Sequence, residues 1–122
     1  MSGRRAWVER LFRSIDAKDA ETFLGFLHDE VLFRFGNAAP TQGKSAAGAA
    51  VQGFFQSIRG VRHTLIDTWD LGDTVICRGD VTYSRHDTSI LCVPFVNVLQ
   101  LDGGLIREYL IYVDISALYR EG

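Results

Sequence analysis

The sequence predicts an α+β domain in which helices cover one face of a curved antiparallel sheet. Three observations lead to this class: the helical patterns all precede residue 60, four long strand patterns follow them, and short turn motifs separate those strands. The length of 122 residues is typical of one domain. We therefore expect a single domain over residues 1–122.

Three helices are expected in the first half. Apolar side chains recur at helical spacing between Arg4 and Ile15. Asp19 then stands where an N-cap would begin a short helix that carries Phe23 and continues to residue 27. The third helix is predicted over residues 44–58, because apolar side chains form a stripe along that segment.

Five strands complete the predicted fold. A short β-rich stretch, residues 31–35, lies between the second and third helices and is followed by a loop. The other four strand patterns occupy residues 61–69, 74–85, 89–101 and 105–113. Turn motifs of Gly, Asp and His lie between these four, which indicates antiparallel hairpins.

The turn between strands 74–85 and 89–101 decides which side chains share a face. With a two-residue turn, one face carries Val75, Cys77, Val81, Cys92, Val96 and Val98, and the other carries Arg78, Asp80, Phe95 and Asn97. Neither face has the polar composition of a solvated sheet. Because the helices can cover only one face, we expect the first to be buried in a homodimer, with both thiols reduced. A three-residue turn would change this assignment.

Composition excludes several classes of function. Thirteen Lys and Arg against 15 Asp and Glu give no electrostatic footprint for nucleic acid. No apolar run approaches a membrane span or a signal peptide, so we expect a cytoplasmic protein without a membrane partner. Cys77 and Cys92 lack metal spacing, and His63 and His86 are isolated. We therefore expect neither a metal nor a cofactor.

The stretch Phe33-Arg34-Phe35-Gly36-Asn37, the later Phe54-Phe55 and the final run 97–114 carry a resemblance to a known family. They resemble the SnoaL-like group of the nuclear-transport-factor-2-like superfamily, over residues 5–119. The resemblance implies a cone-shaped, strongly curved sheet wrapped around a helix-covered pocket, with the outer sheet face in a homodimer. Isomerases, epoxide hydrolases, polyketide cyclases and non-catalytic binders share this fold, so it does not determine the function.

The resemblance to individual enzymes is partial. Where ketosteroid isomerase has its base, its acid and its tyrosine, this chain places Arg34, Asn97 and Leu11, which argues against steroid isomerisation. Arg78-Gly79-Asp80 resembles the Arg-x-Asp of limonene epoxide hydrolase, although the second acid of that enzyme falls on Ile111. The resemblance thus implies Asp80 as a general base oriented by Arg78, without the matching acid.

We expect a pocket between the helices and the sheet that takes a small, apolar, oxygenated molecule. Its predicted lining is Phe33, Phe35, Trp69 and Phe95, with Arg78, Asp80, Asn97 and Tyr109 as the polar groups. Two functions fit: an isomerase, cyclase or hydrolase with Asp80 as base, or a non-catalytic module for small-molecule binding or dimerisation. Arg78 and Asp80 could instead form a surface ion pair, which would remove both from the pocket.

Overall fold

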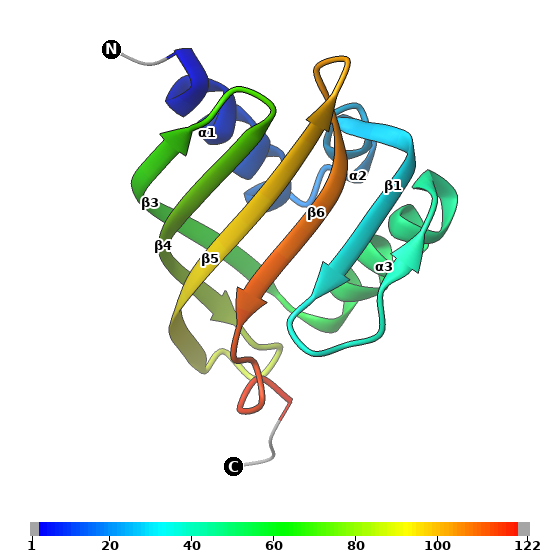
Figure 1. Ribbon diagram of the computed structural model, residues 1–122. Coiled ribbons are helices and arrows are strands. Elements are labelled where there is room, and N and C mark those ends of the chain that lie inside the picture. The colour runs from blue at the N-terminus through cyan, green and yellow to red at the C-terminus, as the bar shows by residue number, and fades with distance from the viewer. Residues whose placement is uncertain (1–2, 120–122) are drawn as a thin grey trace.

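The computed structural model describes residues 3–119, which form six strands in one sheet with helices over one of its faces (Figure 1). The helices are α1 (Gly3–Asp16), α2 (Ala20–Leu24) and α3 (Lys44–Ser57). The strands are β1 (Leu27–Phe35), β2 (Thr41–Gln42), β3 (Gly60–Asp70), β4 (Thr74–Ser84), β5 (Ile90–Asp102) and β6 (Leu105–Val113). This architecture confirms the predicted α+β class.

The strand order is β2-β1-β6-β5-β4-β3, and β1 pairs with β6 in parallel whereas the other pairs are antiparallel. The sheet is mixed, because β1 lies beside β6 and runs in the same direction. Asp19 caps α2 as predicted: its carboxylate accepts hydrogen bonds from the backbone N–H and the hydroxyl of Thr22, which lower the pKa of Asp19. The predicted second helix is too long, since β1 already begins at Leu27.

The turn between β4 and β5 has three residues, 86–88, because Arg85 and Ser89 still pair beyond the ends of the two strands. The N–H of Arg85 donates to the carbonyl of Ser89 at 2.8 Å, and Thr88 closes the loop with a φ of 74°. As a result Cys77 lies opposite Asn97, so odd-numbered residues of β4 share a face with odd-numbered residues of β5. The face assignment based on a two-residue turn was wrong.

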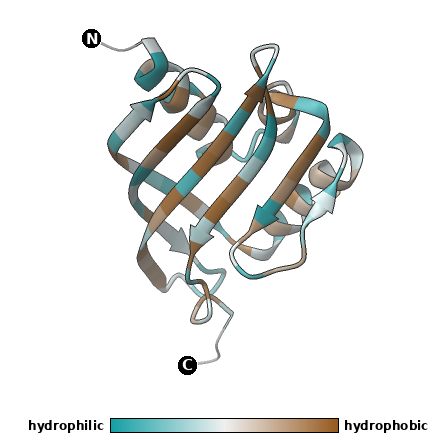
Figure 2. Ribbon diagram, viewed as in Figure 1, coloured by the Kyte–Doolittle hydropathy of each residue, from teal (hydrophilic) through white to brown (hydrophobic). Residues whose placement is uncertain are grey.

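In the corrected register, the residues of the predicted dimer face are divided between the two faces of the sheet. Val75, Cys77 and Val81 are at most 1% exposed and belong to the core beneath the helices. Cys92, Val96 and Val98 lie on the outer face of the sheet. Figure 2 shows that hydrophobic residues (brown) predominate along the central strands, with hydrophilic residues (teal) between them. Both thiols are free.

β3 bends where it crosses β4 at Gly79. The register shifts between Leu65 and Asp67, which moves Trp69 to the outer face. A Cβ atom on Gly79 would lie 2.0 Å from the carbonyl oxygen of Thr64, so only glycine permits this approach. Among the described residues, none of the helices has both the length and the apolar character needed to span a membrane.

Candidate functional site

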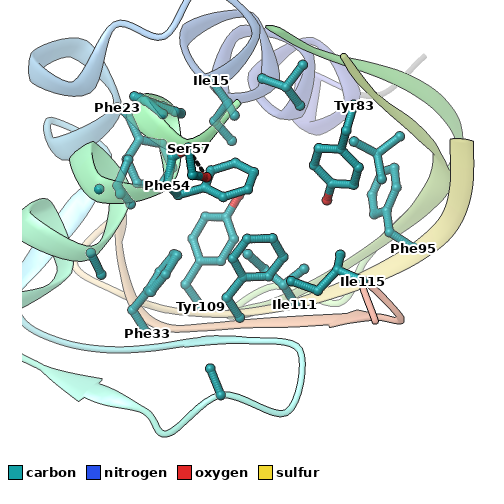
Figure 3. Close-up of a pocket in the computed structure, with 18 of the residues that line it drawn as sticks. Ile15, Phe23, Phe33, Phe54, Ser57, Tyr83, Phe95, Tyr109, Ile111 and Ile115 are labelled. Carbon is teal, nitrogen blue, oxygen red and sulfur yellow. Dashed lines mark hydrogen bonds between the residues drawn. The ribbon is translucent and has the colours of Figure 1, made fainter. Parts of the chain in front are cut away.

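A pocket of about 360 Å³ lies between the inner face of the sheet and the helices (Figure 3). Among residues 3–119, no Asp, Glu, Lys or Arg lines it. The lining is Ile15, Phe23, Phe33, Phe35, Ala38, Ala39, Thr41, Ala50, Val51, Gly53, Phe54, Phe55, Ser57, Val61, His63, Val81, Tyr83, Phe95, Asn97, Tyr109, Ile111, Ile115 and Tyr119. Such a wall suits an uncharged, largely apolar molecule.

The structure brings five of the predicted site residues together in this pocket: Phe33, Phe35, Phe95, Asn97 and Tyr109. The strand register explains why they meet. Phe33 of β1 lies opposite Tyr109 of β6, and Phe35 lies opposite Ile111, which in turn pairs with Asn97 of β5.

The other three predicted residues lie on the outer face, and their placement in the pocket was wrong. The guanidinium of Arg78 donates to one carboxylate oxygen of Asp67, from Nε at 2.8 Å and from Nη2 at 2.7 Å. Asp80 is exposed and its carboxylate forms no hydrogen bond or ion pair with any described residue, and Trp69 is 45% exposed. The three-residue turn and the β3 bulge cause this, and Asp80 cannot act as a base in the pocket.

Two buried polar atoms at the deep end of the pocket lack hydrogen-bond partners among residues 3–119. They are the hydroxyl of Tyr109, a residue with no exposed surface, and Oδ1 of Asn97, a residue that is 2% exposed. The rings of Phe23 and Phe33 pack against Tyr109 at 5.6 and 5.5 Å between centroids. An unpaired buried polar group costs about 1–3 kcal/mol, so these atoms are suited to an occupant that would pair with them.

Tyr109 remains a proton donor in this setting. Burial raises the pKa of its phenol well above the ordinary value, and negative charge on Cys77, Asp16 or Tyr83 would raise it further. Burial likewise raises the pKa of Tyr83. Figure 3 shows the hydroxyl groups of both tyrosines pointing toward the interior of the pocket.

His63 and Asp16 form a hydrogen-bonded pair in the pocket wall. Nδ1 of His63 lies 2.6 Å from Oδ1 of Asp16, and the backbone N–H of His63 donates to Oδ2 at 3.0 Å. A carboxylate only accepts, so Nδ1 carries the proton of the neutral imidazole. Nε2 then holds a free lone pair, and it has no hydrogen-bond partner within the described chain.

The packing around this pair fixes the position of the imidazole. The Phe12 ring stacks on His63 with centroids 4.5 Å apart and planes 10° apart, and Phe95 meets the ring edge to face. Asp16 is the last residue of α1, where the helix dipole disfavours a carboxylate, so its position there needs the compensating contact with His63.

Sequence reasoning missed this pair because it treated His63 as isolated. The periodicity of the two elements held a signal. His63 alternates with Val61 and Leu65 on the apolar side of its strand, and Asp16 lies one helical turn after Phe12. Residues 3–119 contain no group of three or more His, Cys, Asp or Glu placed to hold a metal ion.

Comparison with known structures identifies relatives of the same fold. A nuclear-transport-factor-2-like protein of unknown function from Burkholderia pseudomallei superposes with a TM-score of 0.85 at 14% identity, covering 97% of this chain and 95% of its own. A protein from a Jannaschia species assigned as a SnoaL-like polyketide cyclase gives 0.80 at 18% identity, covering 91% and 85%. An LEH-like epoxide hydrolase from M. tuberculosis gives 0.77 at 15% identity, covering 88% and 80%.

No curated protein matches the sequence. The family model of the SnoaL-like domain, in contrast, matches residues 8–109, which include α3, His63, Asn97 and Tyr109. The chain therefore belongs to the SnoaL-like domain family.

Proposed function

We propose that the protein is an acid–base enzyme that moves a proton on a small, uncharged, apolar molecule bearing a carbonyl or hydroxyl oxygen. One observation carries the proposal: the His63 imidazole lies in the wall of an uncharged pocket, held through Nδ1 by Asp16, with Nε2 unpaired. A histidine held in this way by a carboxylate is oriented as a general base.

The chemistry follows from the groups that share the pocket. Nε2 of His63 takes a proton from a carbon next to the carbonyl, and the electron pair of that C–H bond forms an enolate. The Tyr109 hydroxyl, which remains protonated, donates a hydrogen bond to the enolate oxygen, while Oδ1 of Asn97 accepts one from a substrate hydroxyl. The imidazolium then returns the proton to carbon, so the step involves no net oxidation or reduction.

The relatives support an enzyme rather than a passive binder. Two of the similar structures bear the names polyketide cyclase and epoxide hydrolase, and polyketides and epoxides are small oxygenated molecules. Identities of 18% and 15% are too low to indicate the substrate, so the substrate class is inferred from the residues that line the pocket. The described lining residues include no Asp, Glu, Lys or Arg, which favours a neutral ketone or phenol.

Exchange of the α-protons of 2-tetralone in deuterated water, followed by proton NMR, tests this proposal. The wild-type protein is expected to accelerate the exchange, and Tyr109→Phe to slow it about 100-fold, the loss typical for one oxyanion donor. Because the hydroxyl has no partner in the described protein, its removal should not lower the free energy of unfolding. Tyr112→Phe, on the exposed outer face, is the matched control. Binding of 2-tetralone without exchange would instead indicate a non-catalytic binding module.

We also propose that the protein is a homodimer through the outer sheet face. Val96 of β5 and Tyr112 of β6 lie opposite each other there and are 38% and 58% exposed. Half-buried apolar side chains lie beside this pair along the strands, contributed by Ile76, Val98 and Leu110, and Arg78 of β4 lies opposite Val96. An apolar sheet face of this kind favours burial against an identical face across a two-fold axis.

Val96→Asp is expected to split this dimer, because two carboxylates would lose their water near the axis, and Arg78, which lies opposite Val96, is already paired with Asp67. Light scattering at micromolar concentration should give twice the chain mass of 13.6 kDa for the wild type and the mass of one chain for the variant. Leu71→Asp removes an apolar residue that is 65% exposed in the β3–β4 turn, and it should leave the dimer intact. A wild-type mass of one chain would contradict the proposal.

A further inference from the structure

The mouth of the pocket is built mainly from small residues. Six residues both line the pocket and are exposed: Ala38, Ala39, Ala50, Gly53, Ser57 and Tyr119. Four of the six carry at most a methyl group. They come from the segment that follows β1 and from α3, so the mouth opens between these two parts of the chain.

Gly53 has no structural reason to be glycine. It lies inside α3, where glycine costs about 0.5–1 kcal/mol relative to alanine. A Cβ atom there would meet nothing within 4 Å. Gly48 of the same helix differs, because its Cβ would lie 3.1 Å from a methyl carbon of Leu24. The space in front of Gly53 is thus free for a group that is not part of the described chain.

The other side of the mouth is closed by a hydrogen bond. The Ser57 hydroxyl donates to the carbonyl of Phe54, and its oxygen therefore accepts the 2.7 Å hydrogen bond from the Tyr119 hydroxyl. This contact joins α3 to the segment after β6. A bound molecule that extends out of the pocket would leave on the alanine and glycine side.

Polarity changes along the pocket in a way that orients an occupant. The unpaired atoms of Tyr109 and Asn97 belong to residues at most 2% exposed, at the deep end, whereas the open part of the mouth presents methyl groups and glycine. A molecule with its oxygen at the deep end and an apolar portion toward solvent matches both ends.

We propose that the pocket takes an elongated, uncharged ligand with an oxygen-bearing ring at Tyr109 and Asn97 and an apolar chain that leaves over Gly53, between Ala39 and Ala50. The inference rests on the proposed function, since it names the class of molecule that this site takes. It goes further by giving the ligand's direction and the path by which its chain leaves the pocket.

A series of 4-alkylphenols tests the path of the chain. Phenol, 4-butylphenol and 4-hexylphenol are titrated into the wild-type protein by NMR. The affinity is expected to rise about fourfold for each methylene that is buried at the mouth. Gly53→Leu fills the space and should bring 4-hexylphenol to within about threefold of phenol, while the Kd of phenol stays unchanged.

Ala49→Leu is the matched control, because Ala49 is exposed on the same helix but does not line the pocket. Ala39→Leu closes the mouth from the opposite side and replaces Gly53→Leu if that variant does not fold. An unchanged gain from the alkyl chain in both variants, or an equal loss in Ala49→Leu, would overturn the inference. Phenol that binds without any gain from the chain defeats this inference alone. Absence of both phenol binding and 2-tetralone exchange defeats the proposed function with it.

Discussion

Replacing His63 by glutamine is expected to slow the exchange of 2-tetralone α-protons at least about 100-fold, since a positioned general base typically contributes 10²–10⁴. Glutamine can still donate a hydrogen bond to Asp16, but it has no basic nitrogen at the place of Nε2.

The same substitution at His86, in the turn between β4 and β5, provides the control. His86 is exposed, contacts the carbonyl of Gln56 through Nε2, and lies outside the pocket lining. His86→Gln should therefore keep the wild-type rate. A wild-type rate in His63→Gln, with the fold unchanged by circular dichroism, would remove the base from the proposal.

Asp16→Asn tests whether Asp16 only positions the imidazole of His63 or has a further part in the reaction. The asparagine can accept from Nδ1 of His63 but cannot also accept from the backbone N–H through its amide nitrogen, so the ring is held less firmly. The expected loss of rate is smaller than in His63→Gln, because the imidazole is still present. A loss of rate in Asp16→Asn as large as in His63→Gln would show that the carboxylate does more than position the ring.

Much of the fold could be predicted because it depends on local patterns. Helical spacing located α1 and α3, Asp19 marked the start of α2, and alternation with turn residues located the four long strands. The relation between the strands depends on single-residue details. Thr88 at positive φ makes the β4–β5 turn three residues long, although β-branched residues rarely adopt that conformation.

That single residue in the turn explains most of the errors in the site. It moved Arg78 and Asp80 to the face opposite Phe95 and Asn97, and the β3 bulge moved Trp69. The pairing of His63 with Asp16 spans 47 positions of the sequence, so no local spacing indicates it. Phe33, Phe35 and Phe95 were easier to predict, because large apolar side chains on strands favour the buried face of a sheet.

Gly79→Ala is expected to have the largest effect on stability, a loss of about 3 kcal/mol or more, because overpacking against backbone cannot be relieved by a rotamer change. The new methyl group would lie 2.0 Å from the Thr64 carbonyl oxygen and 3.2 Å from the Cα of Leu65. β3 would have to move away from β4 at its bend, which breaks the pairing of Leu65 with Gly79. Urea unfolding monitored by circular dichroism measures the loss.

Gly60→Ala is the matched control for this stability prediction. Gly60 also lies on β3, but a Cβ atom there would meet only the Ser84 side chain at ordinary contact distance, 3.8 Å. Its free energy of unfolding should stay within about 0.5 kcal/mol of the wild type, as for substitutions without a named defect. Equal stability of the two variants would show that β3 does not need glycine at the crossing.

The consequence of Gly79→Ala extends to the proposed chemistry. His63 precedes Thr64, the residue that the new methyl group would displace, and it is held by Asp16 through both its ring and its backbone N–H. A shift of β3 by the distance needed to admit a methyl group would therefore loosen the imidazole. Any Gly79→Ala protein that still folds should thus exchange 2-tetralone more slowly than the wild type, whereas Gly60→Ala should match it. Full exchange activity in a folded Gly79→Ala protein would show that the crossing of β3 and β4 does not position His63.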